Sequence, residues 1–150
     1  MLKLDLGCSK SKKESFLGVD MDPKSDAEFI WDLEKGLPFL NNSMVDEIYC
    51  RHVLEHIDNI ILLIKEIYRV CKDGATVQLI VPEKDSNSAY ELEHKRYFSL
   101  SSLICVSSPK YRERYGFNFR NIKNEILDDT GTNNKQIRAV LEVVKRNEKT

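Results

Sequence analysis

Two short apolar runs near the start of the chain, each followed at once by polar residues, constrain the fold more than any other feature. The first, residues 2–6, leads into Gly7, and the second, residues 16–20, ends on Asp20. Such runs predict buried parallel strands that bring their carboxyl ends to a ligand. Gly7 allows a sharp turn and a close approach to that ligand, and an acid after the second strand can accept both hydroxyls of a ribose. The sequence therefore predicts a nucleoside-binding α/β domain.

This segment differs from the fingerprint of dinucleotide-binding proteins. The G-x-G-x-x-G pattern has three glycines, whereas Gly7 stands alone here. Asp20 also follows Gly7 after 13 residues (20 minus 7), where a dinucleotide fold has roughly 20. Residues 8–15 leave room for a turn or two of helix at most.

Three further strand signals follow at residues 28–31, 45–50 and 76–81, a spacing too regular for a helical bundle. A helix with Asp58 as its cap precedes the last of them and is expected to close at residues 72–74. Strand, helix and strand in this order predict a right-handed parallel crossover. The apolar stripe of this helix consists of Ile60, Ile64, Ile67 and Cys71.

The second half of the chain predicts a loop, a short helix and a hairpin. Residues 83–95 form a polar loop over the carboxyl edge of the sheet, and residues 99–106 a short helix that begins at a serine cap. Residues 116–127 and 136–145 flank a turn-rich segment and predict a β-hairpin. Residues 136–145 also fit a helical stripe, but their β-branched content favours a strand.

Composition bounds the class of protein. A chain of 150 residues that is 41% hydrophobic indicates one domain over residues 1–150. The net charge of -1 gives no global attraction to nucleic acid or membrane. Residues 60–64, the longest apolar stretch, are too few to span a bilayer, and the absence of a signal peptide predicts a cytoplasmic protein. The four cysteines lie singly, which predicts reduced thiols, with Cys8 placed to line the ligand pocket.

With these elements placed, the chain resembles the class I S-adenosylmethionine-dependent methyltransferases over roughly residues 2–105. The resemblance implies an α/β, Rossmann-like fold with a mostly parallel seven-stranded sheet and a C-terminal antiparallel β-hairpin. It also implies S-adenosylmethionine as the cofactor. The matching segments are residues 4–8, 18–23, 32–39, 45–49, 52–56, 66–74 and 94–98.

The resemblance assigns roles to individual residues. Asp20 would hold the ribose hydroxyls, Met21 would pack on adenine, and Arg51 and His52 would face the sulfonium. Ser9 stands, like Ser11, where this family usually has a further glycine. The residues that would cradle the methionine moiety are Asp5, Leu6, Gly7, Cys8 and Ser9, and those that would meet the adenine amino edge are Asp32 and Leu33.

Methyl transfer needs a base only where the acceptor must lose a proton. His52, His56 and His94 are the candidates, because histidine alone has an unperturbed pKa in the neutral range. For His56 the alternative is a hydrogen-bonded structural residue. For His94 the alternative is a member of an exposed charge cluster that caps the following helix.

Residues 52–56 also match the H-x-x-E-H pattern of inverted zinc proteases. In that pattern His52 and His56 would bind zinc and Glu55 would act as the base. A zinc hydrolase is therefore an alternative function. The sequence offers no compelling third ligand, so no metal site is expected.

Residues 110–123 combine five basic side chains with Tyr111, Tyr115, Phe117 and Phe119. Such a patch could bind single-stranded nucleic acid, but a strand with its aromatic side chains in the core and its charges in solvent is preferred. If residues 110–123 bind nucleic acid, an alternative function is a catalytically silent nucleoside-binding or nucleic-acid interaction module of the same fold.

The length of the chain suggests the kind of acceptor. A chain of 150 residues leaves no N-terminal helices and no inserted lid over the acceptor pocket. We therefore expect either a bulky acceptor such as a protein, an RNA or a glycan, or a homodimer in which each chain covers the other.

Overall fold

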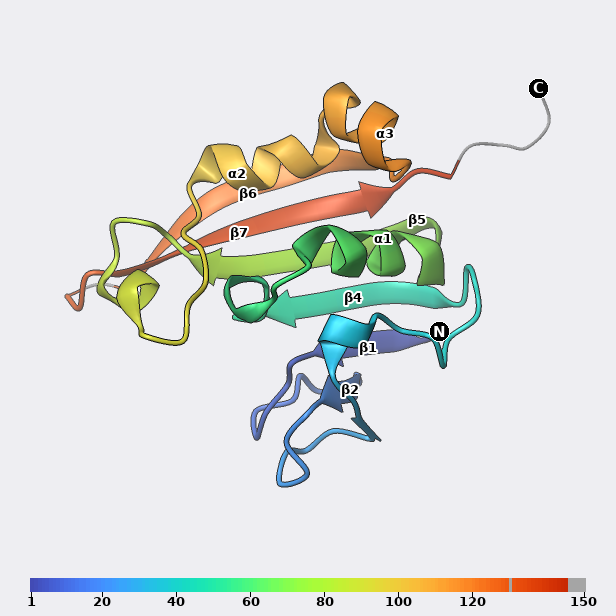
Figure 1. Cartoon of the computed structure of the whole chain (residues 1–150), viewed down its shortest axis with the longest axis horizontal. Coiled ribbons are helices and arrows are strands. Elements are labelled where there is room, and N and C mark those ends of the chain that lie inside the picture. Colours follow the sequence, from blue (N-terminus) through green and yellow to red (C-terminus); the bar gives the residue numbers. More distant parts are fainter. Residues whose placement is uncertain (130, 146–150) are drawn as a thin grey trace.

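Seven strands form one sheet in the computed structural model, which describes residues 1–129 and 131–145. The strand order is β3-β2-β1-β4-β5-β7-β6. The first five strands in this order run parallel, and β7 is antiparallel to both of its neighbours, β5 and β6. This confirms the predicted Rossmann-like fold with its C-terminal β-hairpin (Figure 1). The bounds are β1 (Lys3–Leu6), β2 (Leu17–Asp20), β3 (Phe29–Ile30), β4 (Val45–Arg51), β5 (Cys71–Pro82), β6 (Phe119–Asp129) and β7 (Asn134–Val143).

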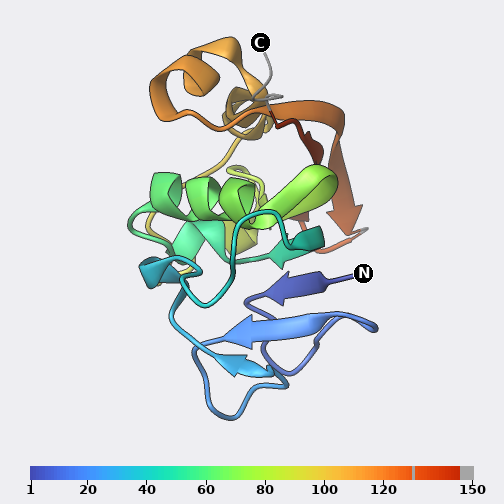
Figure 2. The ribbon, with the colours of Figure 1, turned by 90° about the vertical axis from the view of Figure 1, so that its right-hand side faces the viewer.

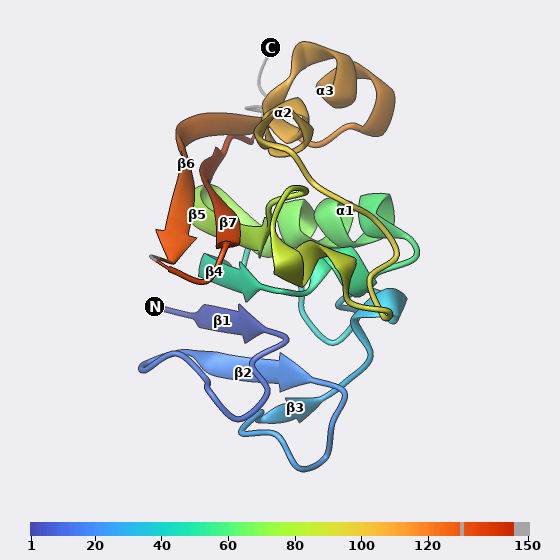
Figure 3. The same cartoon turned by 90° about the vertical axis from the view of Figure 1, so that its left-hand side faces the viewer.

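The three α-helices cover one face of the sheet (Figures 2 and 3). They are α1 (Ile60–Val70), α2 (Leu100–Ile104) and α3 (Pro109–Tyr115). Short 3₁₀ turns complete the structure: η1 (Leu33–Lys35), η2 (Leu54–His56), η3 (Asn87–Tyr90) and η4 (Cys105–Ser107). None of the described helices is long and apolar enough to cross a membrane.

Helix α1 forms as predicted but is bounded differently. Its cap is Asn59, whose side chain accepts the Leu62 N–H at 3.1 Å, and not Asp58, whose carboxylate instead pairs with Lys95 at 2.8 Å. The helix ends at Val70 because Cys71 is already the first residue of β5, where it pairs with Val45. The expected closing turn at residues 72–74 is therefore an irregularity within β5.

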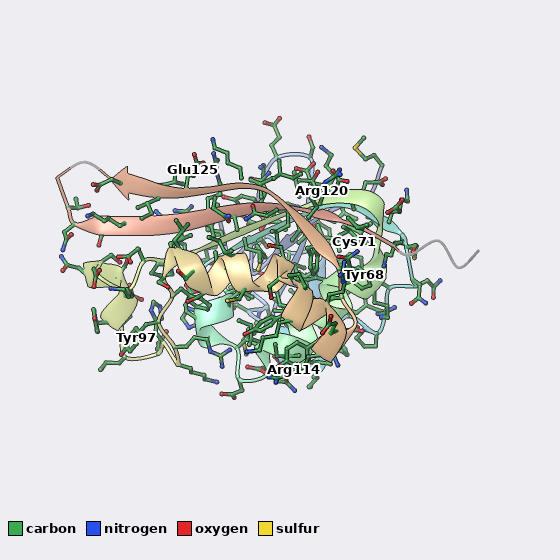
Figure 4. The ribbon with its side chains drawn as sticks, turned by 90° about the horizontal axis from the view of Figure 1, so that it is seen from above. Tyr68, Cys71, Tyr97, Arg114, Arg120 and Glu125 are labelled. Carbon is green, nitrogen blue, oxygen red and sulfur yellow. The ribbon has the colours of Figure 1, made fainter. Side chains whose placement is uncertain are left out.

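Helix α3 was missed by the sequence analysis, which treated residues 110–123 as one unit. Ser108 caps it, Pro109 occupies its first turn, and Gly116 ends it with a left-handed φ of 82°. Phe117 and Phe119 are buried, as the preferred interpretation of this segment predicted, and their ring centroids lie 5.7 Å apart. These two rings are therefore unavailable for stacking on nucleic acid. The remaining charges, such as Arg114 on α3 and Arg120 on β6, point outward (Figure 4).

Candidate functional site

Strands β1, β2 and β4 end at the same edge of the sheet, and a turn at Gly7 opens that edge. Gly7 has a φ of +70°, and its N–H donates to the Val19 carbonyl at 2.7 Å. A Cβ at this position would come within 2.2 Å of Val53 Cγ2. Only glycine fits this turn, as the sequence predicted.

The loop that follows β1 carries no helix and is held instead by two carboxylates. Asp5 is buried and accepts the Lys13 N–H at 2.7 Å. Asp20, at the end of β2, accepts the Ser9 N–H at 2.9 Å and the Asp22 N–H at 2.8 Å. Ser9 adopts a φ of +48°, so the loop takes up here the left-handed conformation that a glycine would favour.

Burial affects the ionisable groups of this loop. It raises the pKa of Asp5 above its ordinary range. It also raises the pKa of the Cys8 thiol to about 11, with the negative charges of Asp5 and Asp20 adding to the effect. Cys8 is therefore a protonated thiol at neutral pH and not a reactive thiolate.

A cavity of about 610 Å³ is open at the ends of β1, β2 and β3. Asp32 caps η1 by accepting the Glu34 N–H, and Met21 is 70% exposed beside it. The volume lies in the range of small-molecule sites. Of the predicted cofactor residues, the cavity brings together Gly7, Ser9, Asp20, Met21, Asp32, Leu33 and His52.

A second cavity, of about 420 Å³, shares Gly7, Ser9 and His52 with the first. It contains the predicted residues Asp5, Cys8 and Arg51. Leu6 is fully buried in the core and lines neither cavity.

The three histidines meet at a third cavity, of about 280 Å³, beyond His52. His52 has a φ of +54°, Nδ1 lies 3.2 Å from Glu55 Oε1, and Nε2 lies 3.0 Å from Gln136 Oε1. The rings of His56 and His94 are 4.8 Å apart. His52 lines all three cavities and therefore stands where they join.

Two residues of this region were missed or given another role by the sequence analysis. Gln136 reaches His52 from β7, and its position in the sequence gave no signal of that contact. Glu55 was considered only as the base of a zinc protease, whereas its side chain is 1% exposed and contacts His52. Val53, Leu54 and Glu55 are buried in succession between the partly buried His52 and His56, and no periodic pattern in the sequence predicts this placement.

The residues present fit the cofactor that the sequence implies. A nucleoside needs an acceptor for its ribose hydroxyls and apolar surface for its base. Asp20 keeps acceptor capacity beyond its two backbone hydrogen bonds, since a carboxylate offers about four lone-pair sites. Met21 and Leu33 provide apolar surface in the same cavity.

The family model described as "Methyltransferase domain" matches residues 5–119. Among curated proteins, no sequence matches the chain.

Several solved structures are similar in fold. A SAM dependent methyltransferase from Archaeoglobus fulgidus has 14% identity and a TM-score of 0.66, with 93% of this chain and 85% of that chain covered. The 1,6-didemethyltoxoflavin-N1-methyltransferase of Burkholderia thailandensis, with bound S-adenosylhomocysteine, has 12% identity and a TM-score of 0.70, with coverages of 96% and 71%. A chain of the complex between the Haloferax volcanii Trm112 methyltransferase activator and a methyltransferase has 13% identity and a TM-score of 0.68, with coverages of 97% and 83%.

Proposed function

The chain belongs to the methyltransferase domain family, and we propose that it moves a methyl group from S-adenosylmethionine to a nucleophile on a bulky acceptor. The observation that carries the proposal is the cavity of about 610 Å³ that gathers Gly7, Asp20 and Asp32, the residues that end or follow three neighbouring strands, beside His52. When bound, the cofactor supplies an electrophilic methyl group on a sulfonium. The protein must therefore supply position more than activation.

Different residues of the chain would hold different parts of the cofactor. Asp20 would accept the ribose hydroxyls, and Met21 and Leu33 would pack against the adenine. Asp32 would meet the adenine amino edge. The remaining predicted contacts, which would surround the methionine moiety, are Asp5, Gly7, Cys8, Ser9 and Arg51.

His52 is the best placed of the three candidate bases, because it alone among them lines all three cavities. Of these cavities, His56 lines the proposed cofactor cavity and the histidine-lined cavity of about 280 Å³, and His94 lines the histidine-lined cavity. The buried Glu55 carboxylate faces its Nδ1 at 3.2 Å and would hold a proton there. Its Nε2 is then free to accept a proton from an acceptor hydroxyl or ammonium group once the Gln136 amide has moved or turned. The φ of +54° is a strained conformation for histidine, as is common at functional sites.

The rim of the histidine-lined cavity supports a bulky acceptor. The cavity is only about 280 Å³. Next to it, the loop after β5 exposes Tyr90, Leu92 and Tyr97, and the two tyrosine rings lie 5.0 Å apart. Exposed aromatic groups beside a small polar cavity suit an acceptor that is larger than the cavity.

Calorimetric titration with S-adenosylhomocysteine tests the cofactor site, with NAD as the negative control. We expect saturable micromolar binding of S-adenosylhomocysteine alone. Asp20→Ala should weaken it by about 1.5–3 kcal/mol, roughly ten- to a hundredfold, because a hydrogen bond to a charged group is lost. Asp26→Ala is the matched control, since Asp26 is an exposed aspartate near β2 that lines none of the three cavities.

Asp20 also orders the loop, so the affinity of one variant cannot isolate the ribose contact. A 2′-deoxyribose analogue of S-adenosylhomocysteine completes a double-mutant cycle with Asp20→Ala. The deoxy analogue should bind the wild-type protein more weakly but should bind the variant nearly as well as the parent ligand does. Additive losses would refute the ribose contact, and no binding of S-adenosylhomocysteine to the wild type would refute the cofactor site.

The acceptor is tested with labelled S-adenosylmethionine and separate pools of protein, RNA, glycan and small molecules. Incorporation into one macromolecular pool, lost in His52→Ala, supports the proposal. A protein that is monomeric by light scattering and labels only small molecules would contradict the bulky acceptor.

A further inference from the structure

Glu55 is a buried carboxylate without a permanent counter-charge. Its side chain is 1% exposed, and Oε2 has no hydrogen-bond partner in the described part of the chain. Oε1 lies 3.2 Å from His52 Nδ1 and 3.9 Å from His56 Nε2. Across residues 1–129 and 131–145, no lysine or arginine nitrogen comes within 4.0 Å of this carboxylate. A buried carboxylate in such surroundings is stabilised by a bound cation.

The ammonium group of Lys95, the residue that follows His94, already pairs with other carboxylates. Lys95 Nζ lies 2.8 Å from Asp58 Oδ2 and 4.0 Å from Glu34 Oε1. The backbone of Lys95, in contrast to its side chain, contacts Glu55: its N–H donates to the Glu55 carbonyl at 2.8 Å. That hydrogen bond fixes the loop after β5 against η2 and brings the preceding residue, His94, next to Glu55.

The imidazole of His94 is oriented as a metal ligand. Its side chain is 3% exposed, and Nδ1 lies 3.1 Å from the Ala89 carbonyl oxygen. A carbonyl can only accept, so Nδ1 carries the proton and the lone pair of the neutral ring is on Nε2. Metal-binding histidines typically donate their second N–H to a carbonyl or a carboxylate in this way.

The distances suit a single cation. One donor atom from each of Glu55, His56 and His94 lies within 4.8 Å of the other two. Zinc bond lengths of about 2.0–2.2 Å require donor atoms roughly 3.3–3.6 Å apart in tetrahedral geometry, so side-chain rotations that move the donor atoms by about an ångström complete the site. Glu91 Oε2 lies 3.6 Å from His94 Nε2 and offers a further donor.

We propose that Glu55, His56 and His94 bind a divalent transition-metal ion, preferentially Zn²⁺, in the cavity next to His52. Two imidazoles and one carboxylate are a known donor set for zinc and for iron. The site differs from the zinc-protease pattern, in which His52 and His56 bind and Glu55 acts as the base. His94 supplies the third ligand that the H-x-x-E-H segment lacks, and His52 remains in contact with Glu55 and Gln136.

The test uses chelator-treated protein of the full chain and Zn²⁺ alone, titrated against a chromophoric chelator. We expect saturable binding at one ion per chain. His94→Ala and His56→Ala should each weaken the affinity at least about tenfold, since removal of even an outer-shell partner has an effect of that size. Glu113→Gln, an exposed glutamate on α3, is the control and should bind as the wild type does.

Substitution with Co²⁺ identifies the ligands. Binding through nitrogen and oxygen gives visible absorption bands without the sulfur charge-transfer band that a cysteine ligand would produce. Glu55→Gln should also weaken metal binding. Circular dichroism checks that each variant is folded, and the histidine variants test the site if Glu55→Gln does not fold.

The proposal is overturned if folded wild-type protein binds neither Zn²⁺ nor Co²⁺ saturably, or if His94→Ala and His56→Ala bind as tightly as the wild type. Titration with S-adenosylhomocysteine is made on the same metal-free sample. Retained binding of that ligand together with absent metal binding would refute the metal site and leave the proposed function intact.

Discussion

The strained loop after β1 gives the sharpest test of how this chain forms its cofactor cavity. Ser9 has a φ of +48°, whereas Ser11, two residues on, has a negative φ. Both serines are exposed, and in the described part of the chain the hydrogen bonds of both residues are made by their backbones. The pair Ser9→Gly and Ser11→Gly therefore changes the same chemical group in the same loop, with backbone strain present at only one position.

The magnitude follows from two opposing effects. A left-handed φ costs an L-residue about 1–2 kcal/mol, which glycine avoids, while glycine itself costs about 0.5–1 kcal/mol in conformational entropy. Ser9→Gly should therefore range from neutral to about 1.5 kcal/mol more stable, and Ser11→Gly should be about 0.5–1 kcal/mol less stable. The entropy effect is common to both, so the difference between the variants, about 1–2 kcal/mol, measures the strain.

Urea unfolding followed by circular dichroism gives both free energies, with equal m-values as the check that the unfolded states are comparable. Titration with S-adenosylhomocysteine should show that Ser9→Gly binds at least as tightly as the wild type, because the loop conformation is then unstrained. If both variants are destabilised equally, the strain at Ser9 is refuted.

Two further predictions concern the turn after β1 and helix α1. Gly7→Ala should lower the free energy of unfolding by at least about 2 kcal/mol, since the φ of Gly7 is +70° and an added Cβ would lie 2.2 Å from Val53 Cγ2. In urea unfolding, the double variant with Val53→Ala should recover part of this loss. Strictly additive losses would refute the clash. The hydrogen bond from Arg69 lowers the pKa of Glu66 below its ordinary value of 4.5, so this stability is present above that pH and is lost as the pH falls through the lower folded value. Glu66→Gln should therefore flatten the loss of stability between about pH 5 and pH 3, whereas Glu113→Gln should keep the wild-type slope.

The cavity at the ends of β1, β2 and β3, where the cofactor is proposed to bind, was largely predictable from the sequence because its determinants are local. Gly7 and Asp20 each follow an apolar run directly, and parallel strands bring such ends together at one edge. The C-terminal hairpin was also predictable from a local signal, because a turn-rich segment separates residues 116–127 from residues 136–145. Helix α3 also has local signals in the sequence, since Ser108 caps it, Pro109 begins it and Gly116 ends it, but residues 110–123 match a basic, aromatic-rich pattern at the same time.

The histidine-lined cavity, where the acceptor is proposed to bind, was not predictable because residues far apart in the sequence create it. Gln136 reaches His52 from β7, and His94 reaches Glu55 through the hydrogen bond between the Lys95 N–H and the Glu55 carbonyl. No spacing or periodicity encodes either contact. The identity of the helix cap also depended on tertiary structure, since Asp58 pairs with Lys95 and leaves the capping position to Asn59.

The face of the sheet without α-helices explains why the loop after β1 depends on carboxylates. Parallel sheets are normally covered on both faces, but β4 alternates between buried residues such as Ile48 and partly exposed ones such as Glu47. Cross-strand ion pairs, Lys3–Glu47 at 2.9 Å and Arg120–Glu142 at 2.5 Å, line the polar face. Such a face is stable in water without a helix.

A loop without a crossover helix needs other anchors, and the carboxylates of Asp5 and Asp20 provide them by accepting the N–H groups of Lys13 and Ser9. Asp20 therefore has two roles, because it orders the loop and also faces the cavity where the ribose is proposed to bind. Its removal should lower both the stability of the loop and the affinity for the nucleoside. The deoxyribose cycle separates these effects, since only the direct contact depends on the missing hydroxyl.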